Sequence, residues 1–289
     1  EWLNKIFIMD RKKNNMFRYF CPDETDSNKM GKMFEGGGRE YVWPVKIKDE
    51  CIVTAGKIIE ILSEHTLLGF LEGYILTGRH VFFATYEAFS MINVSMVDQF
   101  CKYIKQAKRI KWRKPIASLN YLNASLEWRQ EHNGYSHQNP GLISTLTEKH
   151  GEFCSAYFPP DGNSLMVVFE QCFKSRDRVN LIAAAKQTMP QWLTMKEARR
   201  QCEQGVMIWD WIDKVAARDP DIVFAAAGDY MVEECMAAID ILRHEIPELK
   251  MRFVCVSELS DKGFGNSKYL LNNDNLKEFE KYFTMKSTS

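Results

Sequence analysis

Short apolar runs rich in β-branched and aromatic residues alternate with amphipathic helical patterns from about residue 51 onward. Strands that alternate with helices in this way form βαβ units. The sequence therefore predicts an α/β fold with a mainly parallel sheet flanked by helices. The expected strands are His80 to Ala84, Ile116 to Leu122, Phe153 to Phe158 and Val179 to Ala184. The expected helices are Leu67 to Leu76, Met96 to Ala107, Ser164 to Lys174 and Met195 to Glu203.

A separate βαβ unit follows near the C-terminus, with strands at Ile222 to Ala227 and Met251 to Val256 around a helix at about 231–244. One such unit is too small for an independent domain. We therefore expect 196–289 to be the start of a truncated second α/β domain and 46–195 to be the main domain. Residues 10–50 are polar and irregular in pattern, so we expect residues 1–45 to form a connecting arm.

Composition limits the kinds of partner. The 289 residues are 45% hydrophobic, which is enough for one sizeable core and a second, smaller one. Lys and Arg number 38 and Asp and Glu number 38, so no net field favours nucleic acid or an anionic membrane. No apolar run approaches the ~18 residues of a membrane span. Since the sequence begins Glu1-Trp2-Leu3 without an initiator Met, we interpret it as a soluble fragment.

The eight cysteines are spread along the chain without a CxxC pair. In a chain of this size, such a distribution favours buried free thiols in a reducing compartment over a disulfide framework. We therefore expect a cytoplasmic protein.

The densest polar segment, Trp128 to Gly141, comes shortly after an expected strand. Ligands of open α/β sheets bind at the carboxyl ends of strands. Imidazole and amide groups are suited to hydroxyls and phosphates. The segment contains Gln130, His132, Asn133 and His137. A hydrogen-bonded surface loop is the plain alternative. A metal site is less favoured, because the two histidines lack the helical i, i+4 spacing and have no neighbouring Cys or Asp ligand.

Glu64 lies where the apolar run Ile58 to Leu62 gives way to a helical pattern. Burial at such a junction would raise the pKa of the carboxyl group, so that it stays protonated and donates a hydrogen bond to a heterocyclic nitrogen. The alternative is a helix-start carboxylate that interacts with the helix dipole.

The segment Gly78 to Phe89 is rich in aromatic residues, including Phe82 and Tyr86. Aromatic rings at a strand end form walls for flat heterocycles, although such a stripe is more often only core. Ser27, Lys29 and Lys186 are candidate phosphate donors, and each is alternatively a solvated surface residue.

Several stretches between Pro22 and about Leu259 resemble segments of the phosphoketolase family, and they occur in the same order along the chain. The matching segments are Pro22 to Thr25 with Ser27-Asn28, Ser63 to Thr66, Leu71 to Tyr74 with Thr77 to His80, Tyr86 to Phe89, Trp128 to Gly141 and Gln191 to Thr194. Phosphoketolases are similar to transketolases and depend on thiamine diphosphate. The resemblance implies a lyase that cleaves xylulose 5-phosphate or fructose 6-phosphate with inorganic phosphate, giving acetyl phosphate and a shortened aldose phosphate.

The resemblance also implies an organisation. Residues 46–195 would form the pyrimidine-binding domain, and 196–289 would begin the C-terminal domain. The diphosphate-binding domain, which holds Mg²⁺ or Ca²⁺, would lie outside this sequence, and activity would require it. The family shares active sites between subunits, so a homodimer or higher oligomer is expected, with no metal ligand of its own in this chain.

The same resemblance assigns roles to single residues. It implies that Glu64 contacts the pyrimidine ring and promotes its imino tautomer, with Tyr86 and Phe82 as further cofactor contacts. The implied catalytic residues are Glu64, His132 and His137, and the implied substrate or phosphate contacts are Ser27, Lys29, Gln130, His132, Asn133 and Lys186. Position 29 departs from the family, which usually has Arg there. A transketolase proper and a catalytically inert dimerisation module remain alternatives.

Overall fold

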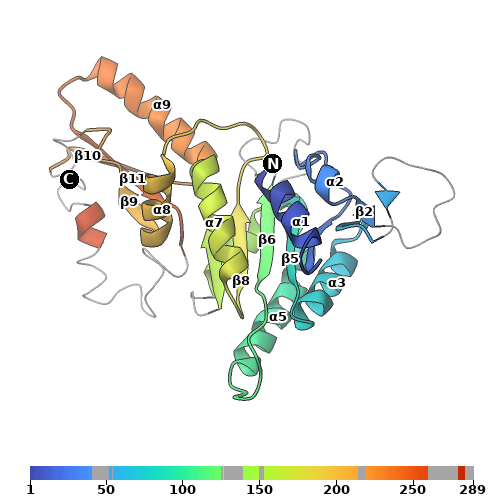
Figure 1. The fold of residues 1–289 in the computed structure, drawn as a ribbon. Coiled ribbons are helices and arrows are strands. Elements are labelled where there is room, and N and C mark those ends of the chain that lie inside the picture. The colour runs from blue at the N-terminus through green and yellow to red at the C-terminus, as the bar shows by residue number, and fades with distance from the viewer. Residues whose placement is uncertain are drawn as a thin grey trace. The chain divides into compact units, whose positions relative to one another are not determined.

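The computed structural model describes residues 1–40, 52–53, 55–124, 126, 139–149, 153–213, 219–259 and 279–283 (Figure 1). The chain divides into two compact units. The first contains residues 1–145 and 169–182, and the second contains 146–168 and 183–289.

The first unit is built on a parallel sheet. The strands of the sheet that belong to this unit lie in the order β3-β2-β4-β1-β5-β6-β8. Register places Phe20 of β1 beside Phe83 of β5, and Phe83 beside Tyr121 of β6. The carboxyl ends of these three strands therefore meet at one edge. The strands are β1 (Phe17–Cys21), β2 (Arg39–Glu40), β3 (Ile52–Val53), β4 (Ile58–Glu60), β5 (His80–Tyr86), β6 (Leu119–Ala124) and β8 (Val179–Ala183).

Helices cover the sheet because its strands are apolar on both faces. The helix α3 packs against β1, β5 and α5. It buries Leu67, Leu68, Leu71 and Ile75, which recur at helical spacing. The helices that begin in this unit are α1 (Trp2–Arg11), α2 (Met33–Gly36), α3 (Glu64–Leu76), α4 (Glu87–Ser90), the 3₁₀ turn η1 (Met91–Asn93), α5 (Val94–Ala107) and α6 (Gly141–Thr147).

The expectation of an irregular arm at residues 1–45 is wrong for residues 1–40. These residues form α1, β1, α2 and β2, and β1 lies between β4 and β5. The strand is only five residues long and follows the charged run at residues 11–13, so its neighbourhood is polar in composition. Its burial comes from pairing with strands that lie far along the sequence: Tyr19 pairs with Ile58 and with Phe82.

The second unit contains a small mixed sheet with strand order β10-β11-β9. The expected βαβ unit is confirmed as β10 (Ile222–Ala227), α9 (Asp229–Glu245) and β11 (Met251–Val256). The antiparallel partner of β11 is β9 (Val206–Ile208), which the sequence did not predict. It follows α8 (Met195–Gln204), whose N-terminus is a capping box of Thr194 and Glu197. The remaining elements are β7 (Cys154–Tyr157) and α7 (Gly162–Lys174), which begins in this unit.

The expectations about the cysteines and about membrane-spanning segments can be compared with the structure. All the described cysteines are free thiols, and all but Cys235 are buried. None of the helices in the described ranges combines the length and apolar character needed to cross a membrane.

Candidate active site

Glu64 is the first residue of α3, at the carboxyl edge of the parallel sheet. The helix begins there because the Ser63 side chain accepts a hydrogen bond from the Thr66 backbone N–H at 3.3 Å. Ser63 itself has extended backbone angles, which stop the helix on its N-terminal side. The Glu64 side chain is half-buried, as the sequence predicted.

A second carboxyl group, that of Glu24, lies near Glu64. Glu24 follows β1, and its Oε2 atom accepts the backbone N–H of Tyr86 at 3.0 Å. Burial raises the pKa of Glu24 to about 7, and the negative charge of Glu64 contributes in the same direction, while the Tyr86 N–H opposes it. At neutral pH this carboxyl group is therefore partly protonated, so it can both donate and accept a proton, as general acid–base chemistry requires.

The turn after β1 is held by side-chain and backbone hydrogen bonds. The Ser27 hydroxyl donates to the Glu24 carbonyl at 3.1 Å. The Thr25 hydroxyl and the Arg39 guanidinium both bond the carboxylate of Glu60, at the end of β4. These contacts connect the turn to two neighbouring strands and fix the position of Glu24.

Asn28, in the same turn, is an unsatisfied polar residue. Its side chain lies beside the Glu24 carboxyl group, whose pKa it lowers slightly, yet both its polar atoms are buried without a hydrogen bond of normal geometry. The residue is only 3% exposed. Leaving a buried amide without a hydrogen bond costs free energy, so Asn28 indicates a position where a polar group of a ligand would fit.

Aromatic rings follow at the end of β5. Tyr86 and Phe89 are both half-buried, and their rings are nearly parallel, with centroids 6.1 Å apart and planes 13° apart. Phe82 differs, because it is 0% exposed and packs on Tyr19 and Phe169 within the core. Of the two aromatic residues predicted to contact a cofactor, Tyr86 is half-buried and Phe82 is fully buried.

Lys29 has an exposed side chain and a left-handed backbone conformation, with φ of 59°. Its backbone N–H donates to the Asp26 carbonyl at 2.9 Å. The turn therefore directs this cation outward two residues after Ser27, next to the buried Asn28.

Lys186 belongs to the second unit and is half-buried just after β8. The preceding Ala185 donates its backbone N–H to Asp229 Oδ2 at 2.7 Å. Asp229 begins α9 after Gly228, whose φ of 88° is one that L side chains rarely adopt. Burial raises the pKa of Asp229 to about 6, and its backbone partners oppose this shift. Asp229 thus positions the segment that carries Lys186.

Residues 128–138 of the polar segment Trp128 to Gly141 lie outside the described residues, so the predictions for their side chains stay predictions. They include Gln130, His132, Asn133 and His137.

Glu24 had no role among the predictions from the sequence. A signal was present, because Glu24 stands within the Pro22 to Thr25 motif, three residues after the end of β1. The misassignment of this region to an arm hid that signal.

The described residues suit a flat, partly protonated heterocycle. Glu64 and Glu24 place two carboxyl groups at one edge of the sheet, Tyr86 adds a half-buried aromatic ring, and both side-chain polar atoms of Asn28 are buried without a hydrogen bond of normal geometry. These features fit the pyrimidine end of thiamine diphosphate.

The fold is that of the transketolases. The solved Pichia stipitis transketolase in complex with sedoheptulose-7-phosphate matches with a TM-score of 0.65 at 15% identity, covering 84% of this chain and 32% of that chain. A structure described as "Split gene transketolase, inactive beta4 tetramer" matches with a TM-score of 0.54 at 14% identity, covering 88% of this chain and 68% of that chain.

The chain belongs to the D-xylulose 5-phosphate/D-fructose 6-phosphate phosphoketolase family, whose model matches residues 1–175, while the model of the family's C-terminal domain matches 186–288. A probable phosphoketolase of Brucella abortus (strain 2308) is 45% identical over 259 residues, covering 90% of this chain. A probable phosphoketolase of Gloeobacter violaceus is 45% identical over 258 residues, covering 88%. The chain spans 33% and 32% of the lengths of these two relatives.

Proposed function

We propose that this chain carries the part of a phosphoketolase active site that binds the aminopyrimidine ring of thiamine diphosphate. Together with further residues outside this sequence, it would convert a ketose phosphate and inorganic phosphate into acetyl phosphate and a shortened aldose phosphate. The observation that carries the proposal is the proximity of the Glu64 and Glu24 carboxyl groups at the sheet edge, within the part of the chain that matches the family model. When bound, thiamine diphosphate supplies the carbon nucleophile for breaking a carbon–carbon bond.

The two carboxyl groups have different roles in proton transfer. Glu64 donates a hydrogen bond to a ring nitrogen of the pyrimidine and holds it in the reactive tautomer. Glu24, with a pKa of about 7, keeps an exchangeable proton beside it at neutral pH. The half-buried Tyr86 ring would contact the cofactor, and Asn28 would bond to a polar group that reaches the turn.

Substrate binding uses the remaining predicted residues. Ser27, Lys29 and Lys186 bind phosphate groups through a hydroxyl and two ammonium groups. The imidazole and amide groups of His132, Asn133, His137 and Gln130 bind the substrate hydroxyls and move protons during loss of water.

The organisation is part of the proposal. Residues 46–195 act as the pyrimidine-binding domain together with the strand β1, and 196–289 begin the C-terminal domain. The Mg²⁺ or Ca²⁺ ion and the diphosphate group are held by residues outside this sequence, and the active enzyme is a homodimer or higher oligomer. The transketolase described as a split-gene, inactive tetramer supports the expectation that this part is inactive alone.

A transketolase proper is disfavoured by the degree of similarity. The probable phosphoketolases are 45% identical to this chain, whereas the Pichia stipitis transketolase is 15% identical.

The test is a fusion of this chain with the segments of the Brucella abortus relative that lie outside the match. We expect the fusion to form acetyl phosphate from xylulose 5-phosphate or fructose 6-phosphate. We expect this chain alone to form none and to bind thiamine diphosphate weakly by calorimetric titration. A folded fusion that binds the cofactor but forms no acetyl phosphate, in phosphate buffer with either sugar, would contradict the proposal.

A further inference from the structure

A cavity of about 450 Å³ lies in the first unit, at the edge of the sheet opposite to Glu64. Phe17, the first residue of β1, and His80, the first residue of β5, both line it. Glu64 lies at the carboxyl edge, so the two places are distinct. The cavity has the volume of a small-molecule site.

Three aromatic rings form apolar walls. The rings of Trp2 and Phe173 are nearly parallel, with planes 3° apart and centroids separated by 6.2 Å. Phe17 meets Phe173 edge-on, with a centroid distance of 5.1 Å and an interplanar angle of 74°. Flat walls of this kind favour a flat ligand, because ring stacking and edge contacts add to the burial of apolar area.

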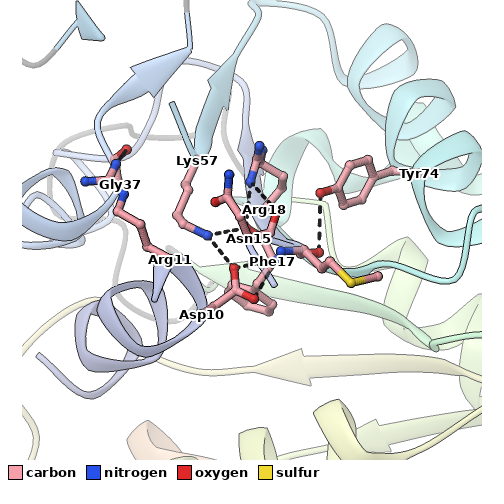
Figure 2. A network of polar contacts seen from close by, with 9 residues as sticks. Asp10, Arg11, Asn15, Phe17, Arg18, Gly37, Lys57 and Tyr74 are labelled. Carbon is pink, nitrogen blue, oxygen red and sulfur yellow. Dashed lines mark hydrogen bonds and ion pairs between the residues drawn. The ribbon is translucent and has the colours of Figure 1, made fainter. Parts of the chain in front are cut away.

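The charged groups that line the cavity are already paired. Figure 2 shows the Asp10 carboxylate directed at Lys57, and Asp10 also accepts the backbone N–H groups of Met16 and Phe17, both at 3.0 Å. The Lys57 side chain is 0% exposed, so the pair is internal to the fold. At the rim, Glu170 forms an ion pair with Lys174 one helical turn later. These pairs leave little net charge for a charged ligand to complement.

The uncharged polar groups are His80 and Asn14. Burial lowers the pKa of His80, and the charge of Arg176 acts in the same direction while Asp10 opposes it. The imidazole is therefore neutral at pH 7, so one ring nitrogen donates and the other accepts. Asn14, exposed at the rim, adds an amide that also donates and accepts.

We propose that this cavity binds a small, neutral, planar aromatic molecule whose edge carries a hydrogen-bond donor and an acceptor together, as in an aromatic carboxamide. The ring lies against Trp2, Phe17 and Phe173, and the polar edge meets His80 and Asn14. A charged ring would lose its hydration on entering the cavity, and the charged groups of the lining are already paired with each other or with Lys57. The site is independent of the proposed catalytic role.

Three probes of equal ring size separate the charge classes: benzamide is neutral, benzoate is an anion and benzamidine is a cation. The readout is the indole N–H signal of Trp2 in ¹H–¹⁵N NMR spectra, assigned with Trp2→Phe. Trp112, 85% exposed and absent from the cavity lining, is the internal control. We expect benzamide to shift the Trp2 signal saturably with a Kd of about 1 mM, as ligand efficiency allows for a ligand of this size. The charged probes should bind at least ~10-fold more weakly.

Two variants test the polar edge. His80→Phe keeps a ring but removes both hydrogen-bonding nitrogens, so benzamide should bind about fivefold to tenfold more weakly. Asn14→Ala changes an exposed side chain, so it should weaken binding of benzamide without affecting the fold. This variant still tests the proposal if His80→Phe does not fold. The proposal is overturned if benzamide leaves the Trp2 signal unchanged, if all three probes bind equally, or if a folded variant binds benzamide as well as the original chain.

Discussion

Glu24 Oε2 accepts the backbone N–H of Tyr86 at 3.0 Å, and this bond joins the turn after β1 to the end of β5. The two residues are 62 positions apart in the sequence. They meet because β1 and β5 are parallel neighbours that end at the same edge. A half-buried carboxyl group is thereby placed next to a half-buried aromatic residue, near the start of α3.

Glu24 makes stability depend on pH. Its pKa in the folded state is about 7, above the ordinary 4.5, so the unfolded state releases this proton first as pH rises. The free energy of unfolding should therefore fall by about 3 kcal/mol between pH 4.5 and 7 on account of this group, and then level off. Glu24→Gln should remove that part of the decrease, measured by urea unfolding across this pH range.

A matched control is Glu72, on α3, whose pKa burial also raises to about 7. Glu72→Gln should flatten the stability profile in the same sense, but it should leave the pH profile of acetyl phosphate formation in the fusion unchanged. If Glu24→Gln also leaves that activity profile unchanged, Glu24 has only a structural role.

Glu64→Gln tests the proposed hydrogen bond to the pyrimidine. In the fusion, this change removes the transferable proton while keeping the size of the side chain. We expect exchange of the cofactor C2 proton, followed by NMR in deuterium oxide, to slow by about 100-fold or more, which corresponds to about 3 kcal/mol in the barrier. Folding should be nearly unaffected, because the side chain is only half-buried. Exchange at the original rate in a folded variant would remove Glu64 from the mechanism.

Lys29→Arg tests phosphate recognition. A guanidinium group offers two parallel donors to a phosphate, whereas an ammonium group acts as a point charge. The Lys29 side chain is exposed and its backbone conformation is the same for either residue, so stability should change little. We expect a severalfold lower KM for phosphate or sugar phosphate in steady-state assays of the fusion. An unchanged or higher KM would place this residue outside the phosphate site.

Asp10 and Lys57 form an ion pair that joins α1 to the start of β4 (Figure 2). Asp10→Asn should destabilise the protein by about 3 kcal/mol, because it leaves the fully buried ammonium group without its counter-ion. Lys57→Met should cost less, since Asp10 keeps two backbone N–H donors. Chemical denaturation of the two variants at pH 7 gives the comparison, and an equal or reversed order would contradict this account.

Local patterns were sufficient for most elements of the fold. The helical spacing of Leu67, Leu71 and Ile75 predicted α3, and the apolar run of β10 before a helix predicted the second βαβ unit. The position of Glu64 at the junction of a strand and a helix was also predictable, because the capping residue Ser63 precedes it directly. Each of these signals lies within a few residues of the structure that it predicts.

Long-range pairing decided the remainder. The residues of β1 carry only a weak local signal, and pairing with β4 and β5 places them within the sheet. The antiparallel strand β9 forms only because β11 offers it an edge. Phe82, predicted as a cofactor contact, is enclosed by rings from β1 and α7, and Glu24 acquires its high pKa from burial against the end of β5. Sequence alone therefore predicted the helices α3, α5, α7, α8 and α9 and the strands that alternate with them, but not α1 and α2. Tertiary structure decided which side chains are buried together, because burial and charge depend on neighbours that are distant along the chain.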